Sequence, residues 1–128
     1  MTRSKLIPLT LALAALAPTT TAVAAVKNPT GIAAMKKGIR DVARLDGHGA
    51  KVSKVSITCP PVTKVGQQRA CAGTFALTLK GKTATYQLTK RNHVLRISPG
   101  AIEYRVAAKA IKKAPGLPAS TDLAGFLQ

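Results

Sequence analysis

The spacing of the apolar residues changes near residue 50, and this change limits the chain to folds that combine a helix with a sheet. Before the change, apolar residues recur every three or four positions, which predicts one buried stripe of an amphipathic helix. Thr30 precedes this stretch and can cap the helix start, and Gly47 follows it and can end the helix. The residues of the stripe are Ile32, Met35, Ile39, Val42 and Leu45.

After the change, apolar and polar residues alternate, which is the period of a half-buried strand. We expect four strands, joined by short turns into an antiparallel meander. Pro60 ends the first of them, because proline cannot donate a hydrogen bond to a sheet. The expected strands span 52–59, 69–79, 83–90 and 94–97.

Residues 101–114 are rich in alanine and fit two structures. Ile102, Val106 and Ala110 share one helical stripe, but Ile102, Tyr104 and Val106 also alternate as in a strand. We favour the helix, and we expect the turn-rich end of the chain to be loosely held. The predicted fold class is therefore α+β: an N-terminal amphipathic helix packed on a small antiparallel sheet of about four strands, with a second helix near the C-terminus.

Residues 1–25 have the organisation of a secretion signal peptide. A positively charged start precedes an apolar stretch at 6–16, and small residues follow. Cleavage after Ala24 or Ala25 leaves a single secreted domain at 26–128, of ordinary size for one domain. We therefore expect a secreted or extracytoplasmic protein that is associated with the cell envelope.

The chain has two cysteines, Cys59 and Cys71. Disulfides persist in oxidising compartments, so an exported domain with two cysteines is expected to join them. Closing a loop of this size stabilises a fold by about 3 kcal/mol in the chain-entropy model.

A strand that ends in Cys59-Pro60 is followed by a short loop with Val65-Gly66 and by Cys71 at the start of the next strand. In these features the chain resembles a family of exported actinobacterial domains of unknown function. The resemblance covers about residues 30–97 and implies a helix on a small antiparallel sheet with the two cysteines bridged. It implies no reaction. Family members often have an aromatic residue at the position of Ala70. They also often have a membrane or lipid anchor, which we do not expect in this chain.

The charge of the chain is strongly positive, with 20 Lys and Arg residues against 4 Asp and Glu residues. Without Arg3 and Lys5 of the signal, 18 basic residues face the same four acidic ones, which gives a net charge of +14. Such a charge favours anionic polymers, anionic lipid surfaces and acidic proteins as partners. The candidate anion-binding residues are Lys36, Lys37, Arg40, Lys80, Lys82, Lys90, Arg91, Lys109, Lys112 and Lys113.

No pattern of residues points to a reaction. His48 and His93 could act as the acid and base of a ribonuclease only if the fold brought both to one phosphate. The two histidines and two cysteines match no metal-ligand spacing, so we expect no metal site and no cofactor. The sequence favours a non-enzymatic secreted domain that binds anionic cell-wall polymer or lipid, or another extracytoplasmic partner, without specific recognition of nucleic acid. A secreted protein inhibitor is the alternative, and a small secreted hydrolase such as a ribonuclease is the second.

Overall fold

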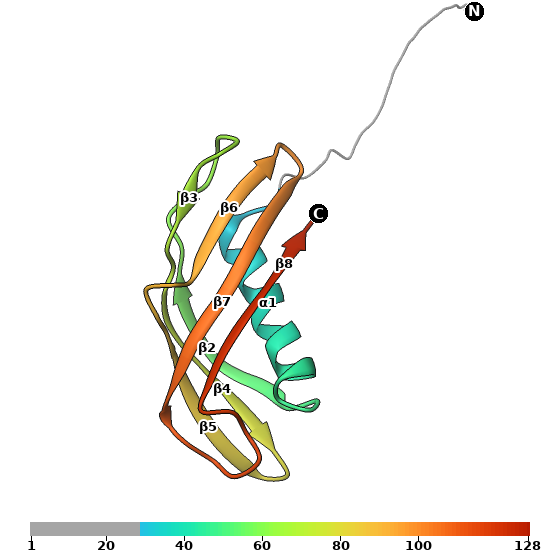
Figure 1. Ribbon diagram of the computed structural model, residues 1–128, viewed down its shortest axis with the longest axis vertical. Coiled ribbons are helices and arrows are strands. Elements are labelled where there is room, and N and C mark those ends of the chain that lie inside the picture. Colours follow the sequence, from blue (N-terminus) through green and yellow to red (C-terminus); the bar gives the residue numbers. More distant parts are fainter. Residues whose placement is uncertain (1–28) are drawn as a thin grey trace, which may run out of the picture.

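The computed structural model describes residues 29–128, so the predicted signal peptide lies outside the described part of the chain. Residues 29–128 contain one helix and seven strands (Figure 1). The strands form a single antiparallel sheet. Six of them follow one another in the order β2-β4-β5-β7-β6-β3, and the seventh, β8, pairs with β7. The elements are α1 (Gly31–Leu45), β2 (Lys51–Thr58), β3 (Gln68–Arg69), β4 (Ala72–Leu79), β5 (Lys82–Leu88), β6 (His93–Ser98), β7 (Ala101–Lys112) and β8 (Ser120–Leu127).

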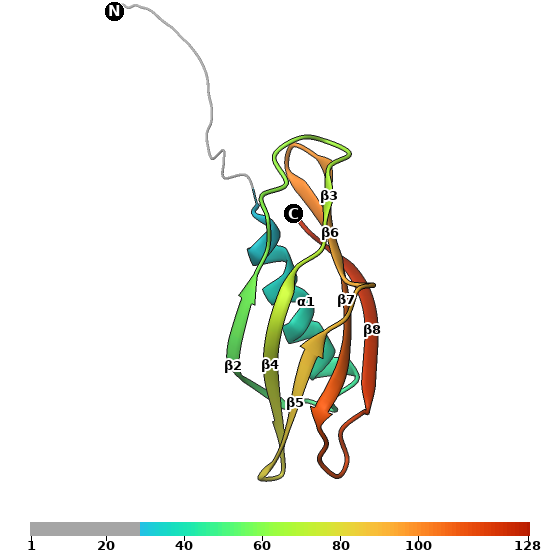
Figure 2. The same ribbon diagram turned by 90° about the vertical axis from the view of Figure 1, so that its left-hand side faces the viewer.

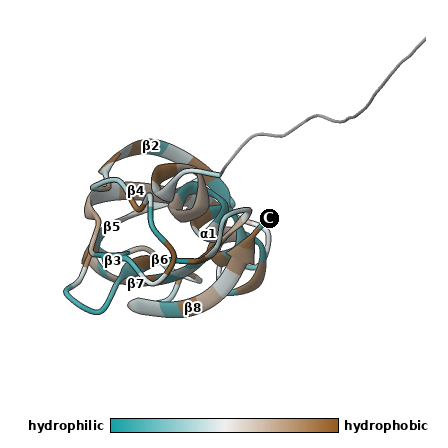
Figure 3. Cartoon of the chain, turned by 90° about the horizontal axis from the view of Figure 1, so that it is seen from above, coloured by the Kyte–Doolittle hydropathy of each residue, from teal (hydrophilic) through white to brown (hydrophobic). Residues whose placement is uncertain are grey.

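The sheet is curled, and α1 lies on its concave side (Figures 2 and 3). Strand β7 pairs along one edge with both β5 and β6 and along its other edge with β8. Register shifts interrupt the pairing of β2 with β4, of β5 with β7 and of β6 with β7. Irregularities of this kind increase local twist. In the twisted sheet, the edge strands β2 and β8 both contact α1.

Helix α1 forms where the sequence predicts it. The predicted cap is confirmed, because the Thr30 hydroxyl accepts a hydrogen bond from the backbone N–H of Ala33 at 3.2 Å. The middle of the apolar stripe is buried against the sheet, whereas Ile32 and Leu45 at its two ends remain 36% and 49% exposed. No helix within residues 29–128 is long and apolar enough to cross a membrane.

The predicted fold class is wrong. The chain folds into a seven-stranded sheet and one helix over residues 29–128, not into a sheet of about four strands with two helices. The stretch predicted as a second helix is β7, and the end predicted to be loosely held is β8. Alanine favours helix only weakly, and here the pairing of β7 along both of its edges outweighs that preference.

The helix approaches β7 closely at Gly38 and Tyr104. A Cβ atom at Gly38 would lie 2.5 Å from the Tyr104 ring, and one at Gly125 would collide with the Tyr104 hydroxyl. The buried Tyr104 ring therefore occupies space that two glycines leave open. Its hydroxyl donates to Asp41, which also accepts from Lys37 at 3.0 Å. Burial raises the pKa of Asp41, but these hydrogen bonds outweigh burial and leave the pKa below its usual value.

We expect Gly38→Ala to lower the free energy of unfolding by about 2 kcal/mol, because a methyl group there overpacks the contact with Tyr104. In a helix, alanine is more favourable than glycine by about 1 kcal/mol. A variant more stable than the unmodified protein would therefore show that Gly38 and Tyr104 are not in close contact. The matched control is Gly100→Ala, since a Cβ atom at Gly100 meets nothing within 4 Å. Urea denaturation of both variants measures the difference.

Candidate functional site

A buried asparagine fixes the connection between β5 and β6. Asn92 is 3% exposed; its side chain accepts from the Cys71 N–H at 2.8 Å and donates to the Cys71 carbonyl at 2.8 Å and to the Thr89 carbonyl at 2.6 Å. Cys71 is joined to Cys59 by a disulfide, which confirms the predicted bond. A disulfide is expected in an oxidising, extracytoplasmic environment. The turn that carries Arg91 is thus held to Cys71, directly before β4.

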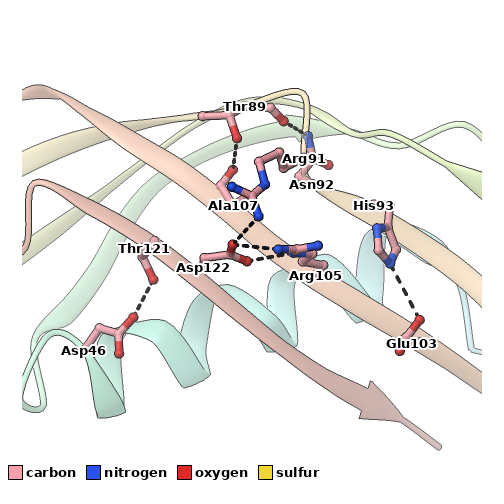
Figure 4. A network of polar contacts seen from close by, with 10 residues as sticks. All are labelled: Asp46, Thr89, Arg91, Asn92, His93, Glu103, Arg105, Ala107, Thr121 and Asp122. Carbon is pink, nitrogen blue, oxygen red and sulfur yellow. Dashed lines mark hydrogen bonds and ion pairs between the residues drawn. The ribbon is translucent and has the colours of Figure 1, made fainter.

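Arg91 lies over the outer face of the sheet, which is the face turned away from α1 (Figure 4). There Asp122 of β8 accepts two hydrogen bonds from Arg105 of β7, at 2.7 and 2.8 Å, and Arg91 lies 3.5 Å from the same carboxylate. The hydrogen bonds from Arg105 lower the pKa of Asp122. One ionised carboxylate is therefore held between two guanidinium groups.

Beside this cluster lies a depression of about 410 Å³, which we call the cationic hollow. Its floor includes Ala107, which is only 3% exposed although it lies on the outer face. Within residues 29–128, the only acidic residue that lines it is Asp122. The polar residues around the hollow are Thr89, Arg91, Lys109, Lys113, Ser120, Thr121 and Asp122.

A second depression of about 400 Å³ also borders Asp122 and is lined by His93, Glu103 and Arg105; we call it the His93 hollow. The His93 Nε2 atom lies 3.6 Å from a Glu103 carboxylate oxygen, which is beyond hydrogen-bond distance. Because Asp122 lines both hollows, they are neighbours on one face. Figure 4 shows His93 and Glu103 on the same side of β7 as Arg105 and Asp122.

A separate group of lysines lies at one end of the sheet. Lys80 and Gly81 form the two-residue turn between β4 and β5, and both have positive φ, as a type I′ hairpin turn requires. The strand register places three further lysines near this turn, from β2, β5 and β7: Lys51 opposite Thr78, Lys82 opposite Leu79 and Lys112 opposite Thr85. We call Lys51, Lys80, Lys82 and Lys112 the basic end.

The structure divides the predicted anion-binding residues into groups. Arg91, Lys109 and Lys113 line the cationic hollow, and Lys80, Lys82 and Lys112 belong to the basic end. The remaining ones lie elsewhere. Lys36 and Arg40 are exposed on α1, Lys90 is exposed in the turn after β5, and Lys37 is half-buried in contact with Asp41 and Tyr104.

The histidines are not brought into one depression in the described part of the chain. His93 lines the His93 hollow, whereas His48 lies in the turn after α1 and lines none of the depressions described above. Within residues 29–128, no group of three His, Cys, Asp or Glu side chains is placed to hold a metal ion.

Sequence reasoning missed Lys51, Arg105 and Asp122. Arg105 and Lys109 are four positions apart and share a face in a helix and in a strand alike. Only if 101–112 is a strand can β8 pair with it and bring Asp122 to the same face. The alternation of Ile102, Tyr104 and Val106 was the signal in the sequence that this stretch is a strand. Comparison with protein-family models, with curated proteins and with solved structures found no match.

Proposed function

We propose that this chain is an exported, non-enzymatic domain that binds anionic polymers of the cell envelope through its positive charge. The supporting observation is that the acidic residues are engaged within the fold, while lysines gather at the basic end. Asp41 contacts Lys37 and Arg44, Asp122 contacts Arg91 and Arg105, and the other two carboxylates face Thr121 and His93.

The lysines of the basic end have no such partners. Within residues 29–128, none of them forms a salt bridge. Four cations at the ends of neighbouring strands attract an anionic surface more strongly than the same charges dispersed would, because their fields add over a short distance. Salt screens such attraction: the Debye length falls from about 10 Å at 0.1 M to about 3 Å at 1 M.

We expect the protein to bind beads that carry poly-glutamate at 50 mM NaCl and to be released near 0.5 M NaCl. Replacing the four lysines of the basic end with glutamine should weaken binding at least tenfold, since each lysine near an anionic surface contributes about 1 kcal/mol. Bound fractions over a salt series measure this.

The matched control removes four charges from other exposed places: Lys36→Gln, Arg40→Gln, Lys54→Gln and Lys64→Gln. Equal losses in the two variants would show that net charge alone acts and would overturn the role of the basic end. Absence of binding by the unmodified protein at 50 mM NaCl would overturn the proposed function. Retention at 1 M NaCl of a partner protein from the same envelope would instead favour the inhibitor hypothesis.

A further inference from the structure

The outer face of β7 and β8 carries a strip of mostly polar side chains with one aromatic ring, Phe126, at its end. The register places Lys109 opposite Ser120, Ala107 opposite Asp122, Arg105 opposite Ala124 and Glu103 opposite Phe126. Residues opposite each other in an antiparallel pair share a face. The strip of β8 from Ser120 to Phe126 is about 20 Å long at the usual rise of a strand.

The two ends of this strip differ in chemistry. At one end the cationic hollow presents Arg91, Lys109 and Lys113 beside the hydroxyl of Ser120. At the other end Phe126 is 53% exposed and lies opposite Glu103 in the register. An aromatic ring that is half in water offers an apolar surface whose burial is favourable.

The carboxylates within the strip restrict what can lie along it. An ionised carboxylate only accepts hydrogen bonds, so Asp122 and Glu103 favour hydroxyl donors. An anionic polymer without hydroxyl groups has none of these donors. An acidic glycan has them, since its hydroxyls can donate to carboxylates, and the C–H face of a sugar ring can pack on an aromatic ring.

We infer that the outer-face strip is a binding site for an acidic polysaccharide. The acidic group of the glycan occupies the cationic hollow, hydroxyl groups donate to Asp122 and Glu103, and one sugar ring packs on Phe126. The two guanidinium groups around Asp122 keep that carboxylate ionised and oriented. This inference rests on the proposed function, to which it adds the chemical class of the polymer.

The test uses three soluble probes: polygalacturonate, which has sugar and charge, poly-glutamate, which has charge without sugar, and dextran, which has sugar without charge. At 50 mM NaCl and equal carboxylate concentration, we expect at least fivefold tighter binding of polygalacturonate than of poly-glutamate, and no binding of dextran. Isothermal titration calorimetry measures each affinity.

Variants locate the site. Phe126→Ala should weaken polygalacturonate binding at least fivefold and leave poly-glutamate binding unchanged, while Phe126→Tyr retains affinity. The control is Ile111→Ala, which removes an apolar side chain of similar exposure, 59%, that lies outside both hollows. Thermal unfolding checks that each variant is folded.

The outcomes separate this inference from the proposed function. Equal affinities for the two anionic probes, or a Phe126→Ala variant that binds polygalacturonate like the unmodified protein, would overturn the glycan site and leave the proposed function standing. Failure to bind either anionic probe would overturn both.

Discussion

Replacing Arg96 with methionine is expected to lower the free energy of unfolding by about 3 kcal/mol, because three backbone carbonyls lose their donor. Arg96 is 6% exposed and, within residues 29–128, makes no salt bridge. Its Nε donates to Val62 at 2.6 Å, its Nη1 to Pro99 at 2.7 Å and its Nη2 to Pro29 at 2.6 Å. One side chain thus ties together the start of α1, the loop after β2 and the turn between β6 and β7.

Arg96→Lys is the informative companion variant. A lysine ammonium is a single compact group and lacks the planar fork that reaches three separate carbonyls. We therefore expect Arg96→Lys to recover only part of the loss seen with Arg96→Met in urea denaturation. A loss below about 1 kcal/mol in the methionine variant, near the net value of one ordinary hydrogen bond, would show that water replaces the guanidinium at these carbonyls.

Removal of the disulfide is expected to have an effect of similar size. In the double variant Cys59→Ala, Cys71→Ala, we expect the free energy of unfolding to fall by about 3 kcal/mol, since the open loop regains conformational freedom in the unfolded chain. Such a loss is a large part of the 5–15 kcal/mol that is usual for a domain.

The hydrogen bonds of Asn92 to Cys71 do not need the disulfide, so the β5–β6 connection should keep its place in the double variant. Equilibrium denaturation with and without a reducing agent measures the effect. The reducing agent should lower the free energy of unfolding of the unmodified protein and leave that of the double variant unchanged. If the double variant were as stable as the unmodified protein, the bond would not hold the fold together.

The first half of the domain could be predicted because its signals are local. The cap at Thr30 is confirmed, and the buried residues of β4 and β5, such as Phe75 and Tyr86, follow the predicted alternation. Each of these features depends on residues a few positions apart, and the short turn at Lys80-Gly81 joins strands that are neighbours in both sequence and space.

The candidate site could be predicted only in part. Composition identifies Arg91, Lys109 and Lys113 as cations. Arg91 lies in the turn after β5, however, whereas Lys109 and Lys113 lie in β7 and directly after it, and only the pairing of β7 with β5 and β8 brings them around one hollow. The role of Asn92 could not be predicted, because two of its three hydrogen bonds are to Cys71, which lies 21 positions earlier in the sequence.

The sequence by itself determined the positive charge, the N-terminal helix and the β4–β5 hairpin, since these depend on composition and on contacts between near neighbours. The expected meander is wrong beyond this hairpin, because β5 and β6 each pair with β7 and not with each other. The tertiary structure alone decided that residues 101–112 form a strand and that 120–127 pair with it. The alanine-rich stretch fits both a helix and a strand locally. Hydrogen bonding to β5, β6 and β8, which no local pattern of residues encodes, selects the strand.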